Sequence, residues 1–228
     1  MPEQDNLYIP AHAEPFGHRL VHFARNVAGD GALKIVALGS SSTAGEGDIV
    51  PYTYRLQAAL RNKYPGRMVD VLNRGVIGQE APDELERMQK DVLEERPSLL
   101  VWQVGTNAVW QRGRDSRVTA AAIVEGLERL SSCELDVVLM DLQYVPALLT
   151  DDKIDGTRYM MSAITGAAAS QSINVFGRFE FMRKLVEVEK AAFDRIIDPN
   201  DEKRLHQSDW AAQRIGYELS EAIAVASA

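Results

Sequence analysis

The sequence lacks the features that mark several large classes of protein. Its single cysteine, Cys133, cannot form an internal disulfide, which excludes a disulfide-rich scaffold. No basic run occurs, and the formal charge of −8 disfavours a surface for nucleic acid or anionic membranes. No segment approaches the roughly 20 apolar residues of a membrane span. We therefore expect a small-molecule partner, no nucleic acid and no membrane span.

The amino-terminal segment contains no recognisable targeting signal. Residues 1–10 carry two acids, no lysine and no apolar core of the length that a signal peptide needs, so we expect a cytoplasmic protein. The 228 residues show no linker, repeat or break in composition. We expect one domain over residues 1–228, with residues 1–32 as an amino-terminal helical extension packed on it.

Apolar runs and helical patterns alternate along the chain. This alternation predicts an α/β fold, built from parallel βαβ units with helices on both faces of one sheet. The runs are largely apolar, which suits strands that are covered on both sides. The predicted strands cover residues 33–38, 68–72, 99–104, 137–142 and 173–176. The predicted helices cover residues 15–28, 52–64, 82–95, 119–130, 154–169, 179–192 and 209–226.

The most informative segment is GSSSTAG at residues 39–45, which directly follows the first predicted strand. In a parallel sheet the carboxyl end of a strand delivers its next side chains into an open crevice. A serine at that place is a candidate nucleophile, but it needs a neighbouring base to accept its proton. The alternative is a serine-rich turn whose hydroxyls bond backbone groups or cap the next helix.

Histidine is the expected base, and the chain has only four. His12, His18 and His22 fall in the amino-terminal segment, outside the alternating pattern. His206 lies in a polar loop before the last predicted helix, from which it can reach the end of the first strand. His18 and His22 have i, i+4 spacing, but no glutamate stands between them in a metalloprotease arrangement, so we expect no metal.

Two further loops at the same predicted edge contain N–H donors. NRGVIG, residues 73–78, follows the second strand, and glycine there lets a backbone N–H approach a ligand closely. Gly105-Thr106-Asn107 follows the third strand, and Asn107 can offer its side-chain amide to the same spot. Acyl transfer needs such donors to stabilise the developing oxyanion.

Taken together, these segments resemble the four blocks of the SGNH (GDSL-type) hydrolases, which contribute a serine, a glycine, an asparagine and a histidine in that order. The resemblance implies a nucleophile at Ser41, a base at His206, and an oxyanion hole of Ser41, Gly78 and Asn107. It also implies a flavodoxin-like three-layer α/β/α fold with a five-stranded parallel sheet. The implied function is a serine esterase that cleaves small or medium acyl esters without a cofactor.

The acid of the site departs from the family pattern. The family has an aspartate three residues before the histidine, but that position is Lys203, which cannot accept the imidazole N–H. Asp201 and Glu202 lie five and four residues before His206, and we favour Asp201 as the residue that orients the ring. Glu202, Asp209 and a Ser-His pair without an acid are the alternatives.

Other functions fit parts of the pattern. A catalytically weakened relative that binds an acylated sugar or lipid would explain Lys203. A nucleotide- or phosphate-binding protein would also place a glycine-bounded loop between strand and helix. The loop lacks the Gly-Lys-Ser/Thr ending of a P-loop and the three-glycine spacing of a dinucleotide site, which speaks against that function. The sequence leaves the oligomeric state open.

A few more side chains receive an expectation. We expect Ser40 to be structural and take Ser42 as the alternative nucleophile. Trp110 and Gln143, in loops after predicted strands, are candidates for walls of the substrate pocket. Cys133 is expected to be a buried small hydrophobe. The charge-rich stretch of residues 84–96 is expected to form a solvated helix face.

Overall fold

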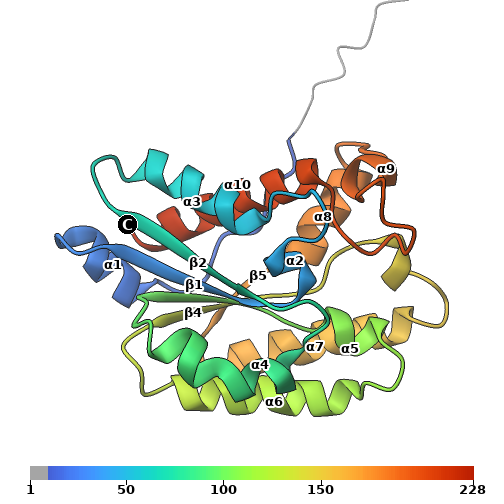
Figure 1. Ribbon diagram of the computed structural model, residues 1–228, viewed down its shortest axis with the longest axis horizontal. Helices are drawn as coiled ribbons and strands as arrows, with labels where there is room; N and C mark the ends of the chain where they lie inside the picture. Colours follow the sequence, from blue (N-terminus) through green and yellow to red (C-terminus); the bar gives the residue numbers. More distant parts are fainter. Residues whose placement is uncertain (1–9) are drawn as a thin grey trace, which may run out of the picture.

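A five-stranded parallel sheet lies at the centre of the computed structural model, which describes residues 10–228 (Figure 1). Every adjacent pair of strands is parallel, in the order β2-β1-β3-β4-β5, so their carboxyl ends lie along one edge. This arrangement confirms the predicted α/β class and the five-stranded sheet. The strands are β1 (Leu33–Gly39), β2 (Val69–Gly75), β3 (Leu99–Gln103), β4 (Asp136–Met140) and β5 (Asn174–Phe176).

Helices cover both faces of the sheet and complete three layers (Figure 1). One face carries α3 (Tyr52–Lys63), α8 (Arg178–Glu187) and α10 (Asp209–Ala226). The other carries α4 (Ala81–Met88), α6 (Ser116–Leu130) and α7 (Ile154–Ser170). The shorter elements are α1 (Val21–Ala28), α2 (Ser41–Ala44), α5 (Thr106–Trp110), α9 (Phe193–Ile196), the π-helical turn η1 (Gln89–Leu93) and the 3-10 turn η2 (Pro146–Leu148).

The inner strands are buried on both sides, as their apolar sequences predict. All five residues of β3 are buried, and its Trp102 packs so closely on α6 that a Cβ at Gly126 would lie 2.3 Å from the indole ring. The edge strand β2 is half-buried after its first residue. The sheet is therefore a rigid support whose carboxyl edge carries α2, α5 and the loop after β2.

Three predicted helices differ most from the boundaries that the sequence pattern indicates. The helix predicted from residue 15 begins at Val21, because the Asn174 side chain bonds both the N–H and the carbonyl of His18 and holds that residue outside the helix. The helix predicted for 179–192 ends at Glu187, and the chain then turns through Lys190, which has φ +59°. The helix predicted for 82–95 divides into α4 and η1.

The element α1 lies at the amino ends of the strands, at the opposite end of the sheet from α2 (Figure 1). Its Phe23 N–H donates to Asp136 Oδ2 at 2.8 Å, which ties α1 to the start of β4. Residues 1–9 of the expected amino-terminal extension lie outside the described part of the chain.

Candidate active site

The hydroxyl run forms a single helical turn, α2, at the carboxyl end of β1. The backbone N–H and the hydroxyl of Ser40 each lie 3.1 Å from Gln103 Oε1, and the Thr43 hydroxyl donates to the same oxygen at 3.3 Å. Gly39 leaves room for this cluster, since a Cβ there would lie 2.4 Å from Thr43 Oγ1. Ser40 and Thr43 therefore fasten α2 to β3, because Gln103 ends that strand.

The two remaining serines face different partners. Ser42 Oγ donates to Gln143 Oε1 at 2.9 Å, and Gln143 Nε2 donates to the Leu205 carbonyl at 2.6 Å. Ser41 Oγ instead lies 3.1 Å from His206 Nε2, and both residues are buried. The contact to histidine thus belongs to Ser41 and not to Ser42. Gln143 is a fully buried bridge from α2 to the histidine loop, so its expected place in the pocket wall is wrong.

The loop before α10 supplies the histidine together with an acid. His206 Nδ1 lies 3.0 Å from Asp201 Oδ2, which also accepts the backbone N–H groups of Leu205 and His206. Burial acts to raise the pKa of Asp201, but these N–H groups and the nearby imidazole outweigh it and lower that pKa. The ionised carboxylate accepts the hydrogen on Nδ1. In the neutral ring Nε2 is then an acceptor that faces Ser41.

The other carboxylates that the sequence suggested lie elsewhere. Glu202 is exposed, and Asp209 pairs with Arg55 at 2.7 Å. Arg204 has φ +54° and its N–H donates to the Asp201 carbonyl, so the chain folds back between Asp201 and His206. This tight turn lets an aspartate five residues before the histidine reach the ring, although Lys203 stands at the family's position.

The loop after β2 is packed directly on α2. A Cβ at Gly75 would lie 2.1 Å from the Ala44 backbone nitrogen, so only glycine fits there without a backbone shift. The Val76 N–H donates to the Gly39 carbonyl at 2.9 Å and joins this loop to the end of β1. The segment that contains Gly78 is therefore held beside the turn that contains Ser41.

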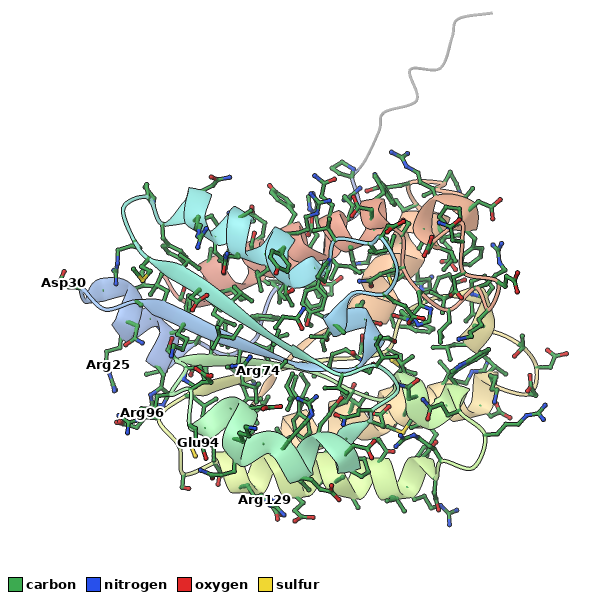
Figure 2. All side chains as sticks on the ribbon, in the orientation of Figure 1. Arg25, Asp30, Arg74, Glu94, Arg96 and Arg129 are labelled. Atoms are coloured by element: carbon green, nitrogen blue, oxygen red, sulfur yellow. The ribbon has the colours of Figure 1, made fainter. Side chains whose placement is uncertain are left out.

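Gly78 lies in a conformation that favours glycine, with φ +81°. Its carbonyl accepts hydrogen bonds from Gln111 Nε2 at 3.0 Å and Arg114 Nη2 at 2.9 Å. These bonds fix the conformation of the loop that contains Gly78. Arg74, from the same segment and labelled in Figure 2, is paired with Glu95 at 2.6 Å.

Asn107 lies in α5, directly after the end of β3. One hydrogen of its Nδ2 is donated to the Gln79 carbonyl at 2.8 Å, and the amide has a second hydrogen to offer. The turn that leads into α5 is fixed by Glu80, whose carboxylate accepts the N–H groups of Gly105 at 2.8 Å and Ala108 at 3.0 Å. The loop after β2 thus holds the asparagine from two sides.

Sequence reasoning missed Glu80, although it leaves a recognisable signal. Glu80 caps α4 by accepting the Ala81 N–H, while Asp83 accepts the Glu80 N–H, a reciprocal capping pair. An acid three residues before another acid at a predicted helix start is the pattern that marks such a cap. The pattern does not reveal that the same carboxylate also binds the asparagine turn, because that contact is tertiary.

The expectation of a solvated face over residues 84–96 is wrong at its first residue. Glu84 is fully buried, and its Oε2 accepts the Trp102 indole N–H at 2.7 Å. Burial raises the pKa of both Glu84 and Glu80, and the charge of Glu80 raises that of Glu84 further. At Glu80 the three backbone N–H groups that it accepts oppose the rise in pKa, and at Glu84 the Trp102 indole N–H does so.

Glu46 is the second residue of the site that sequence reasoning missed. Its Oε2 lies 2.8 Å from His206 Nε2, the nitrogen that also faces Ser41. The only sequence signal is an acid between two glycines soon after the serine run. A cavity of about 10 Å³ at this place is lined by Ser41, Ser42, Gly45, Glu46, Ile49, Pro51, His206 and Gln207.

A larger hollow, of about 490 Å³, contains none of the site residues. It is lined by side chains that include Arg25, Arg96 and Cys133. Figure 2 shows the two arginines at the end of the molecule near α1, away from α2. Cys133 is half-buried there and not fully buried as expected, because it follows the end of α6 in a surface turn. Trp110 is half-buried and is not part of the site cavity lining.

The structure also bears on metals and membranes. Within residues 10–228, no group of three or more His, Cys, Asp or Glu side chains is placed to hold a metal ion. Over the same residues, no helix has the length and hydropathy required to cross a membrane.

Several solved structures have a similar fold. A catalytic mutant of Axe2, an acetylxylan esterase from Geobacillus stearothermophilus, matches with a TM-score of 0.73 and 15% identity over 85% of this chain and 95% of its own. A G-D-S-L family protein from Desulfitobacterium hafniense DCB-2 matches with 0.65 and 19% over 83% and 99%. An alpha/beta hydrolase enzyme from the metagenome of Lake Arreo, Spain, matches with 0.69 and 17% over 88% and 97%.

The sequence comparisons differ in outcome. No curated protein matches the chain. The model of the Non-GDSL lipase-like family matches residues 8–228, nearly the whole sequence. Together with the fold shared with a G-D-S-L family protein, this match confirms the resemblance to SGNH-type hydrolases that the four sequence blocks carry. The chain belongs to the Non-GDSL lipase-like family.

Proposed function

We propose that the protein is a serine esterase that removes a small acyl group from an alcohol. One observation carries the proposal: Asp201 Oδ2, the His206 ring and Ser41 Oγ form a continuous line, with contacts of 3.0 Å and 3.1 Å. The alternative, a catalytically weakened relative, depends on the absence of an acid at position 203, which is a lysine. Asp201 supplies a carboxylate in its place. The proposal therefore assigns turnover, and not binding alone, to this site.

The first half of the reaction forms an acyl-enzyme. His206 Nε2 accepts the Ser41 proton as Oγ attacks the ester carbonyl, and Asp201 stabilises the imidazolium that results. The Ser41 N–H lies in the first turn of α2, where backbone N–H groups have no acceptor within the helix. We assign this N–H, the Gly78 N–H and Asn107 Nδ2 as donors to the tetrahedral oxyanion.

The second half releases the acid. The first half ends when His206 Nε2–H gives its proton to the oxygen of the departing alcohol, and in the second half the neutral ring accepts a proton from a water that attacks the acyl carbonyl. The tetrahedral intermediate collapses, Ser41 recovers its proton from His206, and the free acid leaves. The Ser41 proton leaves with the alcohol and a proton of the attacking water replaces it, so the chain needs no co-reactant besides water.

Acetyl is the acyl group that the comparison with solved structures favours. Axe2, which has the same fold, is named for action on acetylxylan, an acetyl ester. We therefore expect hydrolysis to fall steeply as the acyl chain lengthens from acetyl to butyryl and hexanoyl.

The test compares single variants on p-nitrophenyl acetate. Ser41→Ala and His206→Ala should each abolish turnover beyond the rate of the uncatalysed reaction, whereas Ser42→Ala should keep most of it. A fluorophosphonate probe should label the wild-type protein and Ser42→Ala but not Ser41→Ala. Wild-type hydrolysis by Ser41→Ala, or labelling at another residue, would show that the proposed nucleophile is wrong.

A further inference from the structure

The contact between Glu46 and His206 requires a hydrogen on Nε2. Asp201 receives the hydrogen on Nδ1, so a neutral ring would turn a lone pair toward the Glu46 oxygen 2.8 Å away. Two acceptors at that distance repel, and the contact becomes attractive when the ring carries hydrogens on both nitrogens and its positive charge pairs with the carboxylate. In that form His206 cannot accept the Ser41 proton. The arrangement in the structure is thus one that must open before attack.

Glu46 also occupies the direction that the departing alcohol needs. When the tetrahedral intermediate collapses, the single Nε2–H must donate to the alcohol oxygen at hydrogen-bond distance. In the structure this side of Nε2 faces Glu46 Oε2 at 2.8 Å and Ser41 Oγ at 3.1 Å. Ser41 Oγ carries the acyl group, so the side of Nε2 that faces Glu46 is the one left for the alcohol. A bound alcohol therefore has to displace the carboxylate.

The backbone around Glu46 permits this displacement but keeps the carboxylate near. Gly45 and Gly47 flank it with φ of +85° and +63°, a region that glycine enters without strain, and the Glu46 side chain is 37% exposed. Gly45 is itself held, because a Cβ there would lie 3.1 Å from Pro51. A rotated Glu46 side chain thus remains at the rim of the site, against the alcohol.

A second acceptor lies in the lining of the same cavity. Gln207 follows the histidine directly and is 4% exposed, and its Oε1 is buried with no hydrogen-bond donor among the described residues. A buried carbonyl without a donor is unfavourable, and a hydroxyl group of a ligand would satisfy it. Gln207, with its unsatisfied acceptor, thus lines the same cavity as the charged Glu46.

We propose that Glu46 is a specificity-determining residue of the alcohol site, displaced from His206 by alcohols that carry free hydroxyl groups beside the ester. The inference rests on the proposed esterase function and adds the class of the alcohol: a polyol or a sugar. Hydroxyl groups compensate the lost imidazole contact by donating to the Glu46 carboxylate and to Gln207 Oε1. Alcohols without a further hydroxyl group displace Glu46 from His206 and give it no hydrogen bond in return. Anionic alcohols are repelled by the negative charge of Glu46.

Two acetyl esters that differ only in hydroxyl groups test this directly. Glycerol 1-acetate and propyl acetate have the same acyl group and a three-carbon alcohol. We expect wild-type kcat/KM to favour glycerol 1-acetate by tenfold or more, on the order of one hydrogen bond to a charged group. Glu46→Ala should reduce this preference about tenfold, by raising KM for the glycerol ester and raising kcat/KM for propyl acetate. Glu46→Gln, which keeps an acceptor oxygen, should lie between the two.

The control removes a negative charge from the same loop without touching the histidine. Asp48 is exposed two residues further along, and Asp48→Asn should keep the wild-type preference. An unchanged preference in Glu46→Ala would overturn the inference. So would loss of both activities to the level of Ser41→Ala, since Glu46 would then belong to the catalytic machinery itself.

A measurement on the wild-type protein covers the case in which Glu46→Ala does not fold. Free glycerol should inhibit p-nitrophenyl acetate hydrolysis at concentrations at which 1-propanol does not, and equal inhibition by both would contradict the inference. These outcomes are separate from failure of the proposed function. That failure appears as turnover of p-nitrophenyl acetate that survives Ser41→Ala, whatever the alcohol preference.

Discussion

The buried carboxylate of Glu80 is expected to set the rate of the reaction without touching the substrate. Its two oxygens accept N–H groups on either side of Asn107, from Gly105 at 2.8 Å and Ala108 at 3.0 Å. The perturbation that tests this is Glu80→Gln, which has nearly the same shape. One of the two oxygens becomes an NH₂ group, so a donor then faces a backbone donor in the turn that carries the asparagine.

The magnitude follows from the count of bonds. Glu80→Gln keeps one acceptor oxygen and leaves at least one buried N–H without a partner, which costs about 1 to 3 kcal/mol of unfolding free energy. Glu80→Ala leaves three N–H groups unpaired, those of Ala81, Gly105 and Ala108, which roughly triples that cost. If half or more of the cost for glutamine arises as a displaced Asn107, kcat falls about 2- to 150-fold, since each 1.36 kcal/mol is a factor of ten.

A double-mutant cycle separates this positioning role from general destabilisation. Asn107→Ala alone should lower kcat by 10²- to 10³-fold, the usual loss for one oxyanion donor. Glu80→Gln should cost much less in the Asn107→Ala background than in the wild type, because its effect passes through the missing amide. Kinetics with p-nitrophenyl acetate and thermal unfolding of all four proteins supply the data.

The matched control is Glu84→Gln, a change at a fully buried carboxylate one turn further along α4. It bonds Trp102 and not the turn of Asn107, so kcat should stay within about threefold of wild type. The reasoning about Glu80 is refuted if its effect on kcat adds fully to that of Asn107→Ala. It is equally refuted if Glu84→Gln lowers kcat as much as Glu80→Gln does.

Three further predictions concern the acid, the buried pair and the packing of the site. Asp201→Asn should lower kcat by orders of magnitude, up to ~10⁴-fold, while Glu202→Gln stays near wild type; equal losses in the ester assay would contradict the assignment of Asp201. Because burial raises the pKa of Glu84, its contribution to stability is present below its ordinary pKa and is lost as pH rises through the raised value. The Tm of Glu84→Gln relative to wild type should therefore increase from pH 5 to pH 8, and a constant difference in calorimetry would argue against a raised pKa of Glu84. Gly75→Ala should destabilise the protein by about 1 to 3 kcal/mol in urea unfolding and reduce its activity. The control Gly166→Ala, with no atom within 4 Å of the added Cβ, should leave the activity unchanged and the stability unchanged or slightly raised.

The sequence allowed the sheet and its active edge to be predicted because their signals are local. Five apolar runs separated by helical patterns imply parallel strands, and parallel strands carry their following loops to one edge. The serine run and His206 could be singled out on that basis, and the resemblance to the SGNH hydrolases selected Ser41 within the run. The structure brings Ser41 and His206 to 3.1 Å. The small number of histidines also helped to identify the base, because three of the four lie before the first strand.

The residues that were missed act through tertiary contacts that no local pattern contains. Glu84 has the composition of a solvated helix face, and only the packing of Trp102 against α4 and α6 shows that it is buried. Glu46 follows the serine run in a glycine-flanked loop, and its contact joins residues 160 positions apart in sequence. The start of α1 was misjudged for a similar reason, since Asn174, far along the chain, holds His18 out of the helix.

The place of the acid shows what a catalytic motif specifies physically. An imidazole needs a carboxylate oxygen near Nδ1, and the number of residues between them matters only through the path of the chain. Here the turn through Arg204 shortens that path, and Asp201 Oδ2 accepts two backbone N–H groups of the same loop besides the ring. These bonds fix the oxygen and lower the pKa of Asp201, so the carboxylate is both positioned and charged. Lys203 therefore removes the family spacing without removing the geometry that the spacing normally provides.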